Sequence, residues 1–274
     1  MNKQIQTQHF YVMSDSVGET GEKLARSIQA QFPTARIVLH KNIFITNIET
    51  VDEILEEATK NNGIVLVTIT NRELADHVVN VCSDRGILCY NLLQTFTDII
   101  QERTGIKPTE IPGAQHELSP EYFNRIQAIE FTMNFDDGKD PKGILEADIV
   151  ILGISRTGKT PLSMYLATNG YKVCNIPLIP ENEPPKELFE CEPNKIIGLT
   201  NDAPVVNQHR VIRMQKYGMG MKSRYASIER VQEELDFSNQ LYRKLKCPVI
   251  NVANRSIEES ASIILDMLSL TKSY

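Results

Sequence analysis

The sequence predicts an α/β protein with an N-terminal α/β domain at residues 1–142 and a P-loop kinase-like α/β domain with a mostly parallel sheet at residues 143–274. Short β-branched runs alternate with longer amphipathic stretches in both halves of the chain. A polar segment at 135–141, which contains Gly and Pro, separates the halves. A glycine-rich turn between a strand and a helix follows the first strand of the second half. These three observations favour two sheets with crossover helices.

The N-terminal half contains four apolar runs separated by segments of helical length, so the runs are expected to be parallel strands. The strands are expected at 9–13, 36–40, 63–68 and 86–91. Helices are expected around 24–32 and at 51–58, 73–82 and 120–133. Prolines and glycines interrupt this alternation between 104 and 120. The segment 135–141 is expected to be the domain boundary, although an ordered active-site loop would have the same composition.

The second half repeats the alternation. Strands are expected at 148–152, 171–176, 195–199 and 248–252, and helices at 159–168 and 227–244. A last helix is expected to begin at Ser256, because Glu259 stands at the capping-box position.

Composition limits the possible partners. The 274 residues include 35 acidic and 29 basic side chains, giving a net charge of −6. This balance argues against a nucleic-acid partner, which would need a basic surface. The five cysteines form no C-x-x-C pair, so a disulfide framework or zinc site is not expected. With no apolar secretory or membrane segment visible, a cytoplasmic protein is expected. Whether it forms a homo-oligomer stays open.

One segment fits the phosphate-binding pattern G-x-x-x-x-G-K-T without departure: Gly153-Ile154-Ser155-Arg156-Thr157-Gly158-Lys159-Thr160. Glycines allow successive backbone N–H groups to point at phosphate oxygens, and the following helix adds partial positive charge. Lys159 is expected to reach the terminal phosphates, and the Thr160 hydroxyl to ligate Mg²⁺. The alternative is a plain strand-to-helix turn with an exposed lysine, which the strand and helix context disfavours.

Three acidic residues are candidates for chemistry near this loop. Asp136 and Asp137 could supply a general base that removes the proton of an attacking hydroxyl, or could belong to a solvated linker. Asp202 follows an expected strand and is a candidate second Mg²⁺ partner, or a turn-capping residue.

Two further segments carry polar groups. The stretch 14–21 follows the first strand, where α/β sheets bind ligands, but Ser16 and Glu19 also fit a simple capping box. A basic cluster could neutralise a transferred phosphoryl group from a flexible lid, or form a solvated face: Arg210, Arg213, Lys216, Lys222 and Arg224. The five histidines show no ligand spacing, and none is assigned chemistry.

With these motifs in hand, the chain resembles the pyruvate, phosphate dikinase regulatory proteins, a family of bifunctional Ser/Thr kinases and phosphorylases. The residues that carry the match span nearly the whole chain: Ser14-Asp15-Ser16 with Gly18-Glu19-Thr20, Asp136-Asp137-Gly138, the phosphate loop with Pro161, Tyr165-Leu166-Ala167, Gly198-Leu199-Thr200 and Ser223-Arg224-Tyr225-Ala226-Ser227. A related branch regulates phosphoenolpyruvate synthase, and the segment 14–18 looks closer to the dikinase branch.

The resemblance implies two reactions on a threonine of the dikinase. ADP donates its β-phosphoryl group and inactivates the target; inorganic phosphate then removes that group, releases pyrophosphate and restores the target. Lys159 and the loop amides would hold ADP, with Mg²⁺, and Asp136 or Asp137 could activate the threonine. One departure is Phe135, where the family usually carries His. The rival functions are a P-loop kinase for a small metabolite and a non-catalytic nucleotide sensor.

Overall fold

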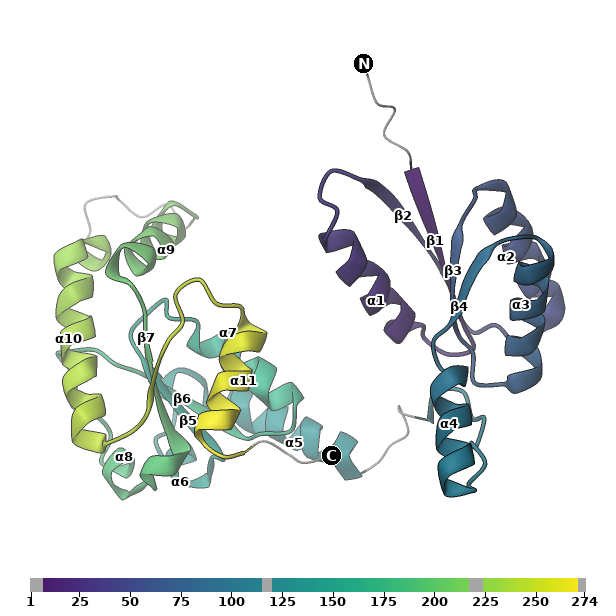
Figure 1. Ribbon diagram of the computed structural model, residues 1–274. Coiled ribbons are helices and arrows are strands. Elements are labelled where there is room, and N and C mark those ends of the chain that lie inside the picture. Colours follow the sequence, from purple (N-terminus) through teal and green to yellow (C-terminus); the bar gives the residue numbers. More distant parts are fainter. Residues whose placement is uncertain (1–6, 115–119, 217–223, 271–274) are drawn as a thin grey trace, which may run out of the picture. The chain divides into compact units, whose positions relative to one another are not determined.

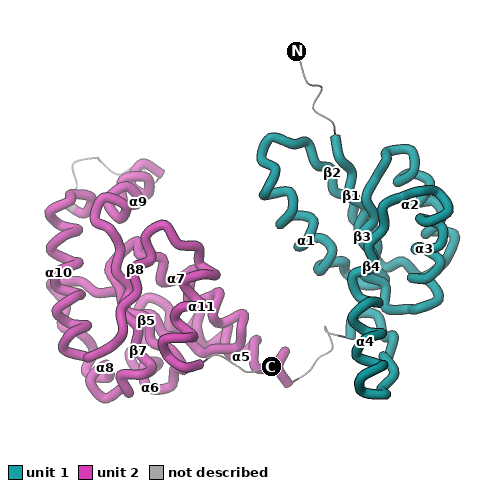
Figure 2. Tube along the Cα trace, in the orientation of Figure 1, with its two compact units in different colours: residues 1–117 teal, residues 118–274 magenta. Residues whose placement is uncertain are grey.

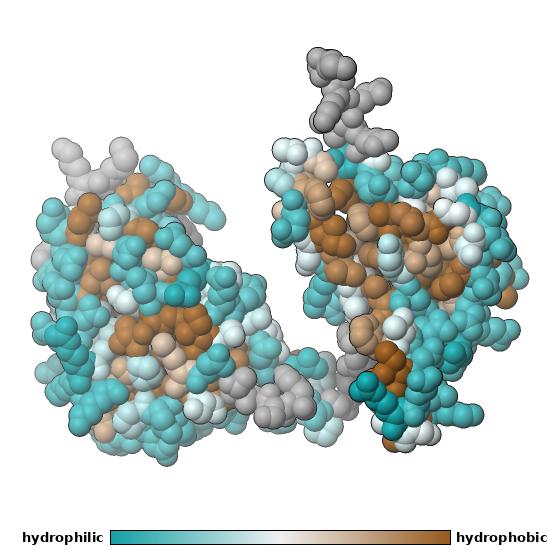
Figure 3. All heavy atoms as spheres, in the orientation of Figure 1, coloured by the Kyte–Doolittle hydropathy of each residue, from teal (hydrophilic) through white to brown (hydrophobic). Residues whose placement is uncertain are grey.

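The computed structural model describes residues 7–114, 120–216 and 224–270, and the chain divides into two compact units, 1–117 and 118–274 (Figure 1, Figure 2). Each unit has its own four-stranded, all-parallel sheet, so the chain is an α/β protein. Polar residues cover most of the visible face of each unit, with apolar patches among them (Figure 3). None of the helices in the described ranges is long and apolar enough to cross a lipid bilayer.

In the first unit the strand order is β2-β1-β3-β4. The strands are β1 (Thr7–Ser14), β2 (Arg36–Asn42), β3 (Ile64–Thr68) and β4 (Leu88–Asn91). The helices are α1 (Glu19–Ala30), α2 (Ile48–Lys60), α3 (Arg72–Asp84) and α4 (Gln94–Thr104). Alternate side chains of β1 point to opposite faces of the sheet. Tyr11 and Met13 pack with α2 and α3, whereas Phe10 and Val12 pack with α1.

In the second unit the order is β6-β5-β7-β8. The strands are β5 (Ile149–Gly153), β6 (Val173–Pro177), β7 (Ile196–Thr200) and β8 (Val249–Asn251). The helices are α5 (Pro120–Asn134), α6 (Gly143–Glu146), α7 (Lys159–Thr168), α8 (Glu187–Glu190), α9 (Ala203–Lys216), α10 (Ile228–Leu245) and α11 (Ile257–Met267). Val150 and Leu152 of β5 pack with α10, and Ile149 and Ile151 pack with α7 and α11.

The boundary between the units differs from the expected one at 142/143. Helix α5 belongs to the second unit, where it contacts α7 and β6. The Thr132 hydroxyl is buried and accepts a hydrogen bond of 3.1 Å from the Val173 amide of β6. The segment after α5 is a short turn bound to β6, so its polar composition reflects hydrogen bonding within the unit and not a linker.

The expected strands are confirmed to within a few residues at each end, but some local expectations are wrong. Helix α4 was not expected; it buries no residue, and Phe96 and Ile100 are exposed, so its sequence shows no core-facing stripe. The capping box that Ser16 and Glu19 offered as an alternative to ligand binding does not form, because the N-cap of α1 is Gly18, without a side-chain cap. The capping box of Ser256 and Glu259 is present at the start of α11.

Candidate functional site

The loop at residues 153–160, called the phosphate loop after the pattern that its sequence fits, connects the end of β5 to the start of α7. Arg156 and Gly158 have positive φ angles of 75° and 81°, which let the chain turn back on itself. A Cβ on Gly153 would lie 2.7 Å from the Thr157 hydroxyl, so this position needs glycine. That hydroxyl in turn donates to the Ile154 carbonyl at 2.9 Å. The Thr157 side chain therefore closes the loop from within.

Lys159 is the first residue of α7, and only 6% of it is exposed. Its Nζ donates to the Ile154 carbonyl at 3.2 Å, across the base of the loop. Burial lowers the pKa of Lys159 to about 8; the Asp137 carboxylate opposes this shift and the Arg156 guanidinium adds to it. The Nε of Arg156 is itself buried without a hydrogen-bond partner among the described residues. The loop thus holds two cations that lack the full compensation of an anion.

The acidic turn, Asp136–Gly138, lies against this loop and is held by Asn175 of β6. Asn175 is fully buried; its Nδ2 donates to Asp136 Oδ1, and its Oδ1 accepts from the Asp137 amide at 3.1 Å. Asp136 Oδ1 also accepts from the Thr160 hydroxyl at 3.2 Å. Asp137 has a φ of 53°, and its exposed side chain lines the cavity in front of the loop. The Asp136 carboxylate is therefore hydrogen-bonded to Asn175 and Thr160, whereas the Asp137 carboxylate faces the cavity.

Phe135, which stands where related sequences were expected to carry His, points away from this cavity. Its ring packs against Gly143, where a Cβ would come within 2.4 Å of the ring. It also lies 4.5 Å from the Phe131 ring, in the apolar cluster beneath the turn. Phe135 is not among the residues that line the cavity. Its side chain is a packing group of the core.

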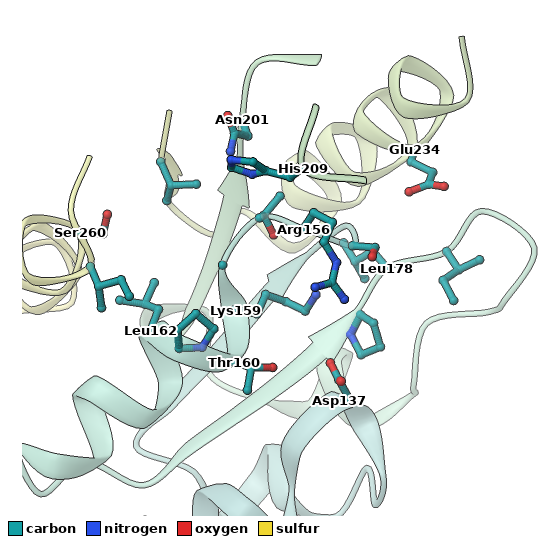
Figure 4. A pocket seen from close by; sticks show the side chains of 18 of the residues that line it. Asp137, Arg156, Lys159, Thr160, Leu162, Leu178, Asn201, His209, Glu234 and Ser260 are labelled. Atoms are coloured by element: carbon teal, nitrogen blue, oxygen red, sulfur yellow. The ribbon is translucent and has the colours of Figure 1, made fainter. Parts of the chain in front are cut away.

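A cavity of about 1060 Å³ opens in front of the phosphate loop. Figure 4 shows Arg156 and Lys159 at its centre, with Leu162 and Ser260 on one side and Asp137 and Leu178 on the other. The cavity has two sides because β6 and β8 lie on opposite sides of β5 in the sheet. On the β6 side the lining residues include Asp137, Pro177, Leu178 and Ile179; on the β8 side they include Asn201, Val252, Arg255, Ser256, Ile257 and Ser260.

A buried ion network, which the sequence did not predict, lies beside the loop and lines part of the cavity through Arg230 and Glu234. Arg210 of α9 is completely buried, and its Nη2 lies 2.5 Å from Glu234 Oε2 on α10. The same nitrogen donates to the Ser155 carbonyl at 3.2 Å, and the Ser155 hydroxyl lies 2.8 Å from the Tyr225 hydroxyl. Arg230 also binds Glu234, at 2.9 Å. These contacts fix the position of the loop relative to α9 and α10.

The remaining sequence candidates have mixed outcomes. Asp202 does not line the cavity; its carboxylate accepts from Asn251 Nδ2 at 3.2 Å, and its backbone carbonyl accepts from the Val205 and Val206 amides at the start of α9. Arg210 is a structural cation and not a mobile one. Arg213 and Lys216 lie on α9, whereas Lys222 and the Arg224 side chain are outside the described part of the chain.

Sequence reasoning missed several polar lining residues, among them Asn201, His209 and Arg255. His209 shows no ligand spacing in the sequence, yet it lies on the cavity wall (Figure 4). Within the described ranges, no group of three or more His, Cys, Asp or Glu side chains is arranged to hold a metal ion. Among the residues already discussed, the oxygens of Thr160 and Asp136 form the pair best suited to Mg²⁺, which prefers oxygen ligands.

Comparison with known proteins adds independent evidence. The family model described as Kinase/pyrophosphorylase matches residues 10–265. A protein of Lactobacillus acidophilus is 45% identical over 260 residues, covering 94% of each chain. Proteins of Enterococcus faecalis and Pediococcus pentosaceus are 46% and 41% identical, over 95% and 98% of this chain and 94% and 100% of their own. All three carry provisional names as pyruvate, phosphate dikinase regulatory proteins.

Proposed function

The chain belongs to the kinase/pyrophosphorylase family, and we propose that it regulates pyruvate, phosphate dikinase by two opposing phosphoryl transfers. In the first, a threonine oxygen of the dikinase attacks the β-phosphorus of ADP, the bond to the bridging oxygen breaks, and AMP leaves. In the second, an oxygen of inorganic phosphate attacks the phosphothreonine, and pyrophosphate leaves while the threonine recovers its proton. Each reaction conserves one phosphoryl group and needs no water.

The observation that carries this proposal is the incompletely compensated positive charge in the phosphate loop. Lys159 is buried with a lowered pKa, and Arg156 Nε lacks a hydrogen-bond partner among the described residues. A diphosphate would supply the missing negative charge and accept hydrogen bonds from both groups. The backbone N–H groups at the start of α7 add to this attraction. The same arrangement suits ADP in the first reaction and phosphate beside phosphothreonine in the second.

Thr160 and Asp136 would hold Mg²⁺, which neutralises charge on the phosphate oxygens when bound. Because Asn175 and Thr160 already bind Asp136, this carboxylate is fixed in place. The Asp137 carboxylate has no such restraint from the described residues, and it lines the cavity. We therefore assign the general-base role to Asp137, which takes the threonine proton in the first reaction and returns it in the second.

The two sides of the cavity separate donor from acceptor in this scheme. The acceptor threonine must reach the general base, so it enters on the β6 side with Asp137, Leu178 and Ile179. The nucleoside then extends to the β8 side, where Val252 and Ile257 provide apolar surface and Asn201 and Arg255 provide polar groups. A cavity of about 1060 Å³ has room for both.

Transfer of label tests the overall proposal. The protein is incubated with Mg²⁺, ADP labelled in the β-phosphate and purified dikinase, and label on a dikinase threonine is expected. Adding phosphate without ADP should release that label as pyrophosphate. The matched control is Lys159→Met, which should transfer no label. Label on a small metabolite, on phosphoenolpyruvate synthase instead of the dikinase, or on nothing at all would contradict the assignment.

Binding measurements test the two sides separately. Ile257 on the β8 side and Ile179 on the β6 side are similarly exposed, at 37% and 40%, so they form a matched pair. Ile257→Ala should weaken ADP binding by at least about tenfold and leave pyrophosphate binding unchanged, because only the nucleoside contacts this side. Ile179→Ala should leave both ligands unaffected and raise KM for the dikinase. The reverse pattern would place the nucleoside on the β6 side.

A further inference from the structure

The first unit contains a second crevice, at the carboxyl ends of β1 and β3. The helix that follows β1 packs on one face of the sheet, and the helix that follows β3 packs on the other. These two strands are neighbours in the order β2-β1-β3-β4. Adjacent strands whose connections leave toward opposite faces create an opening at their carboxyl ends, where α/β proteins bind ligands. A cavity of about 490 Å³ occupies this position.

Asp15 forms part of the wall of this crevice and is only 7% exposed. Its Oδ2 accepts hydrogen bonds from the Thr70 amide and the Thr70 hydroxyl, each at 2.6 Å, and from the Asn71 amide at 3.3 Å. Its Oδ1 is buried and accepts no hydrogen bond within the described ranges. A buried carboxylate oxygen without a donor is costly, so the site lacks a donating group.

The charges around the crevice indicate the chemical nature of the missing donor. The crevice is lined by Asp15, Ile45, Thr46, Asn47, Ile48, Glu49, Asn71, Glu73, Leu74 and Pro112. Three of these described residues are acidic and none is basic. An anion is therefore repelled, although the amino ends of α2 and α3 lie here.

The positive ends of those helices are already satisfied. The Asn47 side chain accepts from the Thr50 amide at 2.8 Å, and the Asn71 side chain accepts from the Leu74 amide at 2.9 Å. Glu49 and Glu73 occupy the first turns and offset the helix dipoles. Within the described ranges, the Asp15 carboxylate oxygen Oδ1 therefore remains without a donor, and its negative charge favours a cationic donor.

We propose that this crevice binds an organic cation, an ammonium or guanidinium group, whose N–H donates to Asp15 Oδ1. The volume suits a side chain or small molecule and exceeds what a single ion needs. Thr70 and Asn71 hold the Asp15 carboxylate in position for this contact. The crevice belongs to the first unit and the phosphate loop to the second, and the proposed phosphoryl transfers do not use the crevice.

Titration of the full chain, labelled with ¹⁵N, by methylguanidinium and ethylammonium tests the proposal. The amide signals of Thr70 and Asn71 should shift with either cation, and should not shift with methylurea, phosphate or Mg²⁺. Asp15→Asn keeps an oxygen for the Thr70 and Asn71 donors but removes the charge, so it should weaken cation binding by at least about tenfold. Glu53→Gln, on the exposed side of α2, makes the same charge change outside the crevice and should have no effect.

Should Asp15→Asn fail to fold, as judged by circular dichroism, Glu73→Gln on the rim replaces it and should weaken binding by about twofold or more. The absence of shifts with either cation, shifts with phosphate or Mg²⁺ instead, or equal binding by the Asp15→Asn variant would overturn the proposal. Transfer kinetics with the dikinase as substrate then identify the source of the cation. A raised KM for that protein with an unchanged KM for ADP identifies one of its basic side chains, and unchanged values for both identify a free amine.

Discussion

Replacement of Lys159 by Met should stabilise the second unit while abolishing nucleotide binding. The pKa of Lys159 is about 8 instead of 10.5, which corresponds to about 3 kcal/mol of unfavourable free energy for the charged form in the folded state. The variant also loses the hydrogen bond to the Ile154 carbonyl, but that oxygen keeps the Thr157 hydroxyl as a donor. Subtracting up to about 1 kcal/mol for this bond leaves an expected gain of about 2 kcal/mol at pH 7.

The stability gain of the Lys159→Met variant should depend on pH, and the lowered pKa of Lys159 determines the direction. Between pH 8 and 10.5 the unfolded state binds more protons at Lys159 than the folded state does, so the wild-type free energy of unfolding rises with pH in this window. The advantage of Lys159→Met should therefore be full below pH 8 and disappear by about pH 10.5. With ADP and Mg²⁺ present and ADP at 100 times its dissociation constant, the free energy of unfolding should rise by about 2.7 kcal/mol for the wild type only.

Urea unfolding followed by circular dichroism measures these free energies, and hydrogen exchange of the β5 amides assigns the transition to the second unit. Lys159→Arg, which keeps the charge, serves as the matched control and should show no stabilisation. A Lys159→Met protein that is less stable than the wild type at pH 7 would refute the argument that burial disfavours the charge. A variant that is still stabilised by ADP would refute the role of the ammonium group.

Three further substitutions test the packing around the site. Asn175→Ala removes the anchor of the acidic turn and should lower kcat of the transfer by at least about tenfold with little change in ADP affinity, as measured by transfer kinetics and calorimetry. Gly198→Ala places a Cβ 2.8 Å from the Tyr242 ring and should destabilise the second unit by about 1–3 kcal/mol in urea unfolding. Ser256→Ala removes the capping box of α11 and should cost about 1 kcal/mol in the same assay.

The strands and the strand-to-helix loop at 153–160 could be predicted because their signals are local. β-Branched runs specify the strands, and the spacing from Gly153 to Thr160 specifies a loop between a strand and a helix. The ion pair of Arg210 and Glu234 could not be predicted, since the two residues are 24 positions apart and on different helices. Asn175 did offer a signal, because a polar residue inside an apolar strand must find a partner when buried.

The domain boundary shows why composition alone is insufficient. Asp and Gly are frequent in linkers, but they are equally frequent in turns that present side chains to a site. Only the hydrogen bonds of Asn175 to the acidic turn distinguish the two cases, and they depend on β6, which lies about 40 residues further along the chain. A boundary at 142/143 would have separated Asp137 from the loop that it faces.

The arrangement of the acidic turn also explains how the chain tolerates Phe135. Phe135 turns toward the core because Gly143 leaves space for its ring, so a side chain at this position does not reach the cavity in this conformation. In the proposed mechanism, proton transfer depends on Asp137, whose left-handed φ of 53° directs its side chain differently from that of Asp136. Asn175 binds the backbone of one aspartate and the carboxylate of the other. A single buried amide thereby holds one carboxylate beside Thr160 and leaves its neighbour able to approach a hydroxyl.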